Sequence, residues 1–288
     1  MGALAGAVAP NEEADTMRRT VAVGVDGSPE SLAAADWAAR EAVRRRVPLR
    51  LVNAAAPAPG LAGPADPHSA PVTVNWSPYA VADELRRAHP AAEITVDQIA
   101  GQALPVLFAA ADEAALVVLG SRGVGAAAGF LLGSVALTVA GQAPVPVVLV
   151  RAARTSEARG GGDVVLGLDL VRPGEGVLRF AFDAAARRSG TLRVVHGWSQ
   201  GPPAGPDAGT EVLAAALAPW REHYPQVRVS GEAVTADPAH HLLAASADAA
   251  LLVLGRHEPP TRLSPHLGPT THTVLHQAPL PVAVIPAT

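Results

Sequence analysis

Four residues between positions 120 and 134 have the types and the spacing of an anion-binding loop. Gly120 and Gly123 are followed, nine residues later, by Gly133 and Ser134. Glycine lets a backbone approach a ligand closely and adopt positive φ, so that N–H groups turn toward phosphate oxygens. A helix that starts at the Gly-Ser pair adds unsatisfied N–H groups, its dipole and a hydroxyl donor. The pattern therefore predicts a phosphate site.

A second pattern overlaps the first and indicates a different ligand. Residues 123–128, with the sequence GVGAAA, fit the dinucleotide fingerprint G-x-G-x-x-G/A. That fingerprint normally forms the first strand-to-helix turn of its unit, and an acidic residue about 20 positions later binds the ribose. Here it comes late in its domain, and residues 143–145 are Ala-Pro-Val. We interpret it as a coincidence in a chain with 27 glycines.

Asp26 is a polar group that the fold would bring to the same place. It follows the strand-like run VAVGV at 21–25, and Gly120 ends the similar run LVVLG at 116–120. Ligands of open α/β sheets bind beyond the carboxyl ends of the strands. Asp26 can there accept hydrogen bonds from ribose hydroxyls or approach a phosphate-bound Mg²⁺. The alternative is a helix-capping turn in Asp26-Gly27-Ser28-Pro29, and the two uses can coexist.

The elements that must position these groups occur twice along the chain. VAVGVDGS at 21–28 matches VVLGLDLV 143 residues later, and AALVVLG at 114–120 matches AALLVLG 135 residues later. QAPVPVVLV at 142–150 also matches QAPLPVAVI 135 residues later. The change of offset places a length difference in the middle of each half, where loops tolerate it. Such a repeat predicts two copies of one domain.

Each half has the pattern of alternating strands and helices. In the first half, apolar or alternating runs predict strands at 21–25, 49–54, 94–99, 116–120 and 145–150, and apolar periodicity predicts helices at 31–46 and 104–113. Ser134 is predicted to cap a helix at 135–140 that Gly141 ends, and the proline-rich stretches 57–78 and 200–209 are predicted to be surface loops. Largely apolar strands alternating with helices predict a doubly wound, Rossmann-like parallel sheet, present twice.

The repeat also sets the expected domain boundaries. We expect a disordered extension at 1–16, a first domain at 17–151, a linker at 152–163 and a second domain at 164–288. The extension lacks the basic region of a secretory signal, and Met17 is an alternative start to Met1.

Composition excludes several classes of function. The chain has 288 residues, a formal net charge of −4, no cysteine and no basic stripe, so neither nucleic-acid binding nor a disulfide framework is expected. Residues 123–150 carry no formal charge, but the second copy of this region contains Arg256, Glu258 and Arg262, which argues against a membrane span. A cytoplasmic location is expected.

The motifs VGVDGS and VVLGSRG, and the full glycine pattern followed by PVPV, resemble the universal stress protein family. The resemblance covers both halves, in the tandem form of that family with its adenine nucleotide alpha hydrolase-like fold, and implies ATP with Mg²⁺ in the family's ATP-binding branch. It implies that the turn at Asp26 and Gly27 and the backbone of Ala54 hold ribose and adenine. It also implies that Gly120, Gly123, Gly133, Ser134 and Val135 hold the sugar and phosphates, with Arg122 adding charge.

The resemblance further implies a stress-response regulator. The two halves would form an intramolecular pseudo-dimer in which the strands at PVPV and PLPV pair, and two chains can associate further into a homodimer. A regulatory protein partner is implied but not identified, and ADP or AMP can replace ATP. The alternatives are a slow ATPase or phosphotransferase and an interaction scaffold without nucleotide. No general base stands out near Asp26, so no catalytic residue is assigned.

The second copy departs from the glycine pattern. Gly123 is replaced by Glu258, Gly125 by Pro260 and Ser134 by Pro269. A carboxylate at about 4 Å from a phosphate costs on the order of 1 to 4 kcal/mol, so ATP is expected in the first half only.

The second half also carries eight of the ten histidines. His272 and His276 are four residues apart, but no third ligand has suitable spacing, so no metal site is predicted. His196 is expected to be structural.

Overall fold

The computed structural model describes residues 20–55, 76–121, 133–152, 162–170, 174–198, 206–235, 237–256 and 267–287. The first half contains β1 (Val21–Gly24), α2 (Pro29–Arg45), β2 (Leu49–Ala55), α3 (Pro78–Ala88), β3 (Ile94–Ala100), α4 (Ala103–Glu113), β4 (Leu116–Ser121), α5 (Ser134–Gln142) and β5 (Val147–Arg151). The second half contains β6 (Val164–Gly167), α6 (Glu175–Arg188), β7 (Thr191–Trp198), α7 (Pro206–His223), β8 (Arg228–Thr235), α8 (Pro238–Ala245), β9 (Leu251–Gly255), α9 (Pro269–Gln277) and β10 (Val282–Ile285).

Both halves contribute to one ten-stranded sheet with the order β3-β2-β1-β4-β5-β10-β9-β6-β7-β8. Neighbouring strands are parallel except at the centre, where β5 and β10 run antiparallel with Val148 opposite Ala283. This confirms the expected doubly wound fold and the pairing of the two last strands. Because each of these strands would otherwise be an open edge, their pairing covers the two edges that most need a partner.

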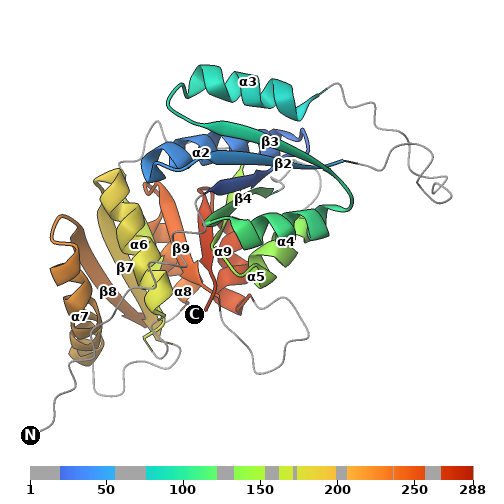
Figure 1. Cartoon of the computed structure of the whole chain (residues 1–288). Helices are drawn as coiled ribbons and strands as arrows, with labels where there is room; N and C mark the ends of the chain where they lie inside the picture. Colours follow the sequence, from blue (N-terminus) through green and yellow to red (C-terminus); the bar gives the residue numbers. More distant parts are fainter. Residues whose placement is uncertain are drawn as a thin grey trace, which may run out of the picture.

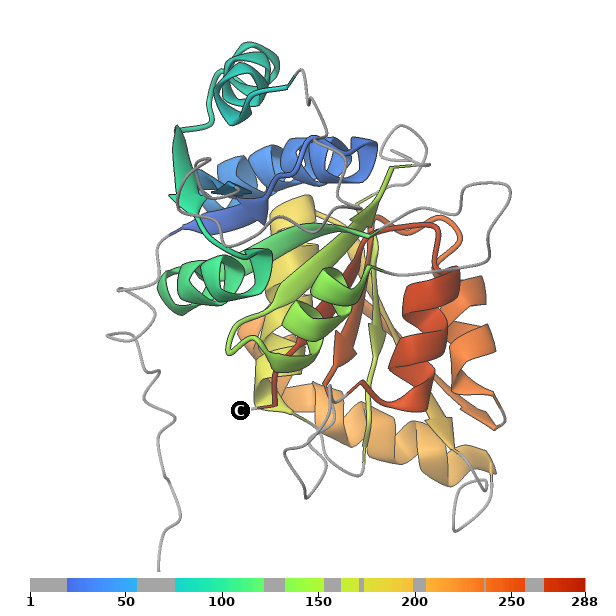
Figure 2. The same ribbon diagram turned by 90° about the vertical axis from the view of Figure 1, so that its right-hand side faces the viewer.

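Helices cover both faces of the sheet and are divided in the same way in each half. Buried side chains of α2, α3, α6 and α7 pack together on one face, and those of α4, α5, α8 and α9 pack on the other. The ribbon views in Figures 1 and 2 show this division, with the green α5 and the red α9 on the face opposite the yellow α6. The strands are buried on both faces, which accounts for their nearly continuous apolar sequences.

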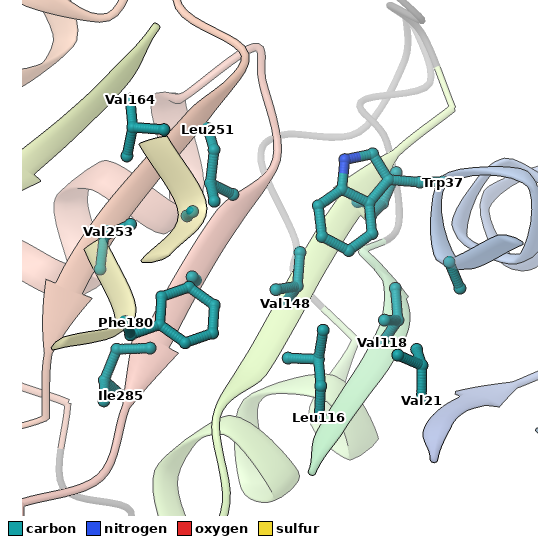
Figure 3. Close-up of a cluster of buried hydrophobic side chains, with 14 of the residues drawn as sticks. Val21, Trp37, Leu116, Val118, Val148, Val164, Phe180, Leu251, Val253 and Ile285 are labelled. Atoms are coloured by element: carbon teal, nitrogen blue, oxygen red, sulfur yellow. The ribbon is translucent and has the colours of Figure 1, made fainter. Parts of the chain in front are cut away.

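The core on the α2 and α6 face is continuous across the boundary between the halves. Figure 3 shows Trp37 and Val148 of the first half in the same cluster as Phe180, Leu251 and Ile285 of the second. Trp37 is 2% exposed and Phe182, deeper in the same cluster, is fully buried. The halves therefore share a hydrophobic core as well as a sheet.

An ion pair inside this shared core joins α2 to α6. Glu41 of α2 is completely buried, and its carboxylate lies 2.6 Å from both the Arg45 and the Arg188 guanidinium groups. Arg188 comes from α6 and stacks over the Trp37 ring, while Arg45 stacks over the Phe180 ring. The pair satisfies a charge that burial alone would make very costly.

The structure corrects three boundaries expected from the sequence. Helix α5 begins at Ser134 rather than after it, and Gly133 is the N-cap residue. Gly141 lies inside α5, which continues to Gln142, because a single glycine weakens a helix without ending it. Residues 206–209, expected in a loop, form the first turn of α7, with Pro206 at a position where a missing N–H costs nothing. The expected extension at 1–16 and most of the linker lie outside the described residues.

Candidate nucleotide site

The predicted site residues lie where the strand order of the first half reverses. β1 pairs with β2 on one side and with β4 on the other, and the chain continues from these two strands into α2 and α5 on opposite faces. The carboxyl ends of β1 and β4 therefore flank the crevice in which open α/β sheets bind their ligands. Asp26 follows β1 and Gly120 lies in the last part of β4.

Asp26 forms a compact turn that also starts α2. Its Oδ1 accepts hydrogen bonds from the backbone N–H and the hydroxyl of Ser28, at 2.9 and 2.6 Å. Ser28 Oγ in turn accepts from the N–H of Ser31 as the N-cap of α2. The capping interpretation of this segment is thus confirmed. Because the Asp26 side chain is exposed, the turn presents its carboxylate at the mouth of the crevice.

Gly27 has a φ of +80°, which favours glycine, and its Cα is covered by the indole ring of Trp76. A Cβ at Gly27 would overlap three atoms of that ring. Trp76 directly precedes Ser77, the N-cap of α3, and it is partly buried against the core. Sequence analysis missed Trp76, because it follows a long proline-rich stretch and no spacing connects it to Gly27.

Gly120 is required for a different reason from the one expected. It lies in β4 opposite Val150, so its backbone is that of a strand and not of a positive-φ turn. A Cβ at this position would come within 2.6–2.7 Å of the backbone of Glu30 and Ser31. The missing side chain thus lets the first turn of α2 pack directly on the end of β4. Gly120 brings the Asp26 turn and β4 together.

Helix α5 supplies donors at the other side of the crevice. Gly133 caps it with extended backbone angles, φ −63° and ψ 137°, and has no side chain that could accept from the first turn. Ser134, exposed, and Val135, half-buried, are the first two helical residues. Their N–H groups are thus at a helix start without a side-chain cap, an arrangement that suits an anion.

The remaining predicted residues divide between the end of β2 and a segment outside the described residues. Ala54 lies in β2 opposite Ile99, half-buried, with its backbone at the carboxyl end of the sheet. Arg122 and Gly123 belong to residues 122–132, which the structure does not describe. The structure therefore brings Asp26, Gly27, Ala54 and Gly120 to one end of the sheet.

Asn53 is a buried residue at this end of the sheet that sequence analysis did not select. Its Nδ2 donates to the carbonyl of Val25 at 2.9 Å, and its Oδ1 accepts from Gln98 Nε2 at 3.3 Å. It fixes the backbone that leads into Asp26. The repeat contained the signal, since His196 is the equivalent residue of the second half and its Nδ1 lies 2.8 Å from the carbonyl of Leu168. His196 is buried within β7, as expected for a structural residue.

The second half lacks several of these features. Helix α6, as described, begins at Glu175 with Gly174 as an N-cap that makes no side-chain bond. A Cβ at Gly255, the equivalent of Gly120, would meet only a side-chain methyl of Val177 at 3.1 Å. Helix α9 begins with Pro269, which has no N–H to donate. Glu258 and Pro260 lie outside the described residues.

Neither a metal cluster nor a membrane-spanning helix is evident in the described parts of the chain. No group of three or more His, Cys, Asp or Glu side chains converges there in a way that could hold a metal ion. None of the helices described combines the length and apolar character needed to cross a bilayer.

The sequence matches one family model twice. The model described as the universal stress protein family matches residues 17–151 and again residues 162–286. The chain belongs to the universal stress protein family. It is a tandem member, and the two matches coincide with the two halves of the sheet.

Relatives of the same length are found in mycobacteria. A universal stress protein of Mycolicibacterium smegmatis is 34% identical over 287 residues, covering 92% of this chain and 96% of that protein. A universal stress protein of Mycobacterium tuberculosis is 34% identical over 307 residues, covering 92% of this chain and 95% of that protein. The tandem organisation of this universal stress protein is therefore shared by relatives over nearly their whole length.

A solved structure shares the fold of the whole chain. The crystal structure of a universal stress protein from Archaeoglobus fulgidus superposes with a TM-score of 0.69 at 17% sequence identity. The superposition covers 93% of this universal stress protein and 98% of the other chain.

Proposed function

We propose that this universal stress protein is a cytoplasmic regulator that binds ATP, with Mg²⁺, in its first domain. The observation that carries the proposal is the meeting of three features at one strand crossover: an exposed carboxylate turn, a helix start without a side-chain cap, and a glycine contact that packs α2 on β4. An adenine nucleotide has complementary groups for the first two, hydroxyls for the carboxylate and phosphates for the helix start.

Each residue is assigned a role by its chemistry. Asp26 accepts hydrogen bonds from the ribose hydroxyls or approaches the phosphate-bound Mg²⁺, and Gly27 shapes the turn that carries it. The backbone of Ala54 contacts adenine. The α5 start binds phosphate through the N–H groups and hydroxyl of Ser134 and Val135. The loop that contains Gly120, Arg122, Gly123 and Gly133 completes the phosphate site.

In this proposal the first domain comprises 17–151, the linker 152–163 and the second domain 164–288, and the second domain binds nucleotide weakly or not at all. The α9 start has lost a donor and a hydroxyl at Pro269, and Glu258 brings a negative charge to the loop. A like charge at about 4 Å from a phosphate costs on the order of 1 to 4 kcal/mol, which lowers affinity by one or more factors of ten.

The proposed role is regulatory rather than catalytic. A nucleotide that contacts both the β1 turn and the α5 start favours whichever conformation or assembly state, including a homodimer, holds these elements together. A protein partner would then recognise that state.

The first experiment identifies the natural ligand. The full chain is purified without added nucleotide and denatured, and the released small molecules are identified by mass spectrometry. ATP, ADP or AMP at a substantial fraction of the protein concentration is the expected result. Release of a different compound, or failure of added ATP to bind the empty protein, contradicts the proposal.

A matched pair of variants then localises the ligand. Asp26→Asn keeps an oxygen that can accept from Ser28 but removes the charge, so ATP affinity should fall at least tenfold while the fold persists. Asp169→Asn makes the same change in the second half and should leave affinity unchanged. Because Trp76 covers Gly27, ATP should also change the tryptophan fluorescence, and Trp76→Phe should remove that signal. Equal effects of the two Asp variants would contradict the assignment to the first domain.

A further inference from the structure

The last helix of the second half carries two histidines whose side chains meet. His272 and His276 are one turn apart on α9, and their Nε2 atoms lie 3.3 Å from each other, with ring centroids 4.4 Å apart. His272 is exposed and His276 is half-buried. Both rings therefore direct the same nitrogen toward a common point.

The fold itself does not require these histidines. The equivalent positions of the first half, 135 residues earlier, are Leu137 and Gly141 of α5. Both helices occupy the same place in their halves, on the same face of the sheet (Figure 2). The imidazole pair is therefore a feature of the second half alone, in the helix whose start has lost the serine of the first half.

The separation of the two nitrogens matches chelation of a tetrahedral ion. Two nitrogens at about 2.0–2.1 Å from zinc and at the tetrahedral angle are about 3.3–3.4 Å apart. A square-planar ion such as Cu²⁺, with ligands at right angles and similar bond lengths, would need about 2.8–2.9 Å. The observed 3.3 Å fits the tetrahedral value.

The surroundings leave room for the remaining ligands. His272, Thr273, His276 and Gln277 line a hollow of about 520 Å³, and one water takes only about 30 Å³. The site lies in the C-terminal half of α9, where the helix dipole favours a cation. The nearest printed charge is Arg151, whose guanidinium donates to the carbonyls of Leu275 and His276 and so is held against the backbone.

We propose that His272 and His276 form a zinc-binding site on the second domain, with water in the other coordination positions. Sequence spacing did not indicate it, because no third ligand is evident; two protein ligands give a site from which zinc exchanges. The second domain would thus bind a cation near the helix that in the first domain is proposed to bind phosphate. The site does not depend on nucleotide binding.

Zinc binding to the full-length, tag-free chain tests the proposal. Calorimetric titration with zinc chloride should show a site of one zinc per chain that is weakened at least tenfold in His272→Leu, which copies the first half, and in His276→Gln. The matched control is His240→Gln with His241→Gln, because these adjacent residues of α8 have ring centroids 6.0 Å apart and a perpendicular orientation. The control should keep the site.

The fold of each variant is checked by circular dichroism and by its thermal midpoint without zinc. Zinc binding that is absent from the wild type, equal in all variants, or lost only in the α8 control would overturn the proposal and leave a hydrogen-bonded histidine pair. If His272→Leu proves unfolded, His276→Gln gives the same decision. The nucleotide-site variant Asp26→Asn should bind zinc normally.

Discussion

The buried ion pair between α2 and α6 gives a sharp test of how the two halves are held together. Glu41→Gln removes one charge from a site with no solvent exposure while keeping the shape of the side chain. Arg188, whose side chain is 3% exposed, then has a buried charge without its partner at 2.6 Å. Breaking a buried pair in this way costs about 3–5 kcal/mol.

Urea denaturation followed by tryptophan fluorescence measures this loss, since Trp37 lies beneath the Arg188 guanidinium. The double variant Glu41→Met with Arg188→Met removes both charges and should recover most of the stability, because an apolar replacement of a whole buried pair is often neutral or better. Asp83→Asn, which breaks the exposed pair with Arg86, should cost at most about 0.5 kcal/mol. A loss below about 1 kcal/mol for Glu41→Gln would refute the importance assigned to the pair.

The same residue predicts a pH dependence. Burial alone would raise the pKa of Glu41, but the guanidinium groups of Arg188, Arg45 and Arg44 together outweigh burial and hold the pKa below its ordinary 4.5. The folded state thus binds this proton less readily than the unfolded state. The stabilisation is complete above pH 4.5 and is lost as the pH falls below it. The stability difference between wild type and Glu41→Gln should therefore shrink in acid, and a constant difference would contradict the lowered pKa.

Three further substitutions test the packing around the site. Gly120→Ala places a methyl group against the backbone at the start of α2 and should destabilise by about 1–3 kcal/mol, whereas Gly255→Ala, which meets only a movable side chain, should cost clearly less in the same urea series. Gly27→Ala introduces strain at positive φ and displaces an indole ring, so fluorescence should shift and stability fall by about 1–3 kcal/mol. Ser28→Ala removes the α2 cap and should cost about 1 kcal/mol by thermal denaturation. Equal effects of the two glycine variants at the strand ends, or no fluorescence change at Gly27, would contradict these contacts.

The architecture could be predicted from the sequence because its signals are local and occur twice. The apolar runs around Val21, Leu116 and Val147 are long enough to indicate buried parallel strands, and the repeat predicted that the last strands pair. The start of α5 was predicted one residue too late, because both Gly133 and Ser134 are acceptable caps and the spacing alone does not choose between them.

The details of the site could be predicted only in part. The Asp26 turn follows from its own sequence, but the role of Gly120 depends on how closely α2 approaches β4, which is a tertiary contact. The position of Trp76 on Gly27 and the contact between Glu41 and Arg188 join residues that are far apart in the chain, and no periodicity connects them. Asn53 could have been found only by comparing it with His196 in the repeat.

The number of ATP molecules bound per chain tests the central claim most directly. Equilibrium dialysis of the full chain, after endogenous nucleotide has been removed, should give one ATP per chain. The variant Gly123→Glu, which copies the residue of the second half, should bind none while keeping its circular dichroism spectrum. Two equivalent sites in the wild type, no binding at all, or undiminished binding by Gly123→Glu would contradict a single nucleotide site in the first domain.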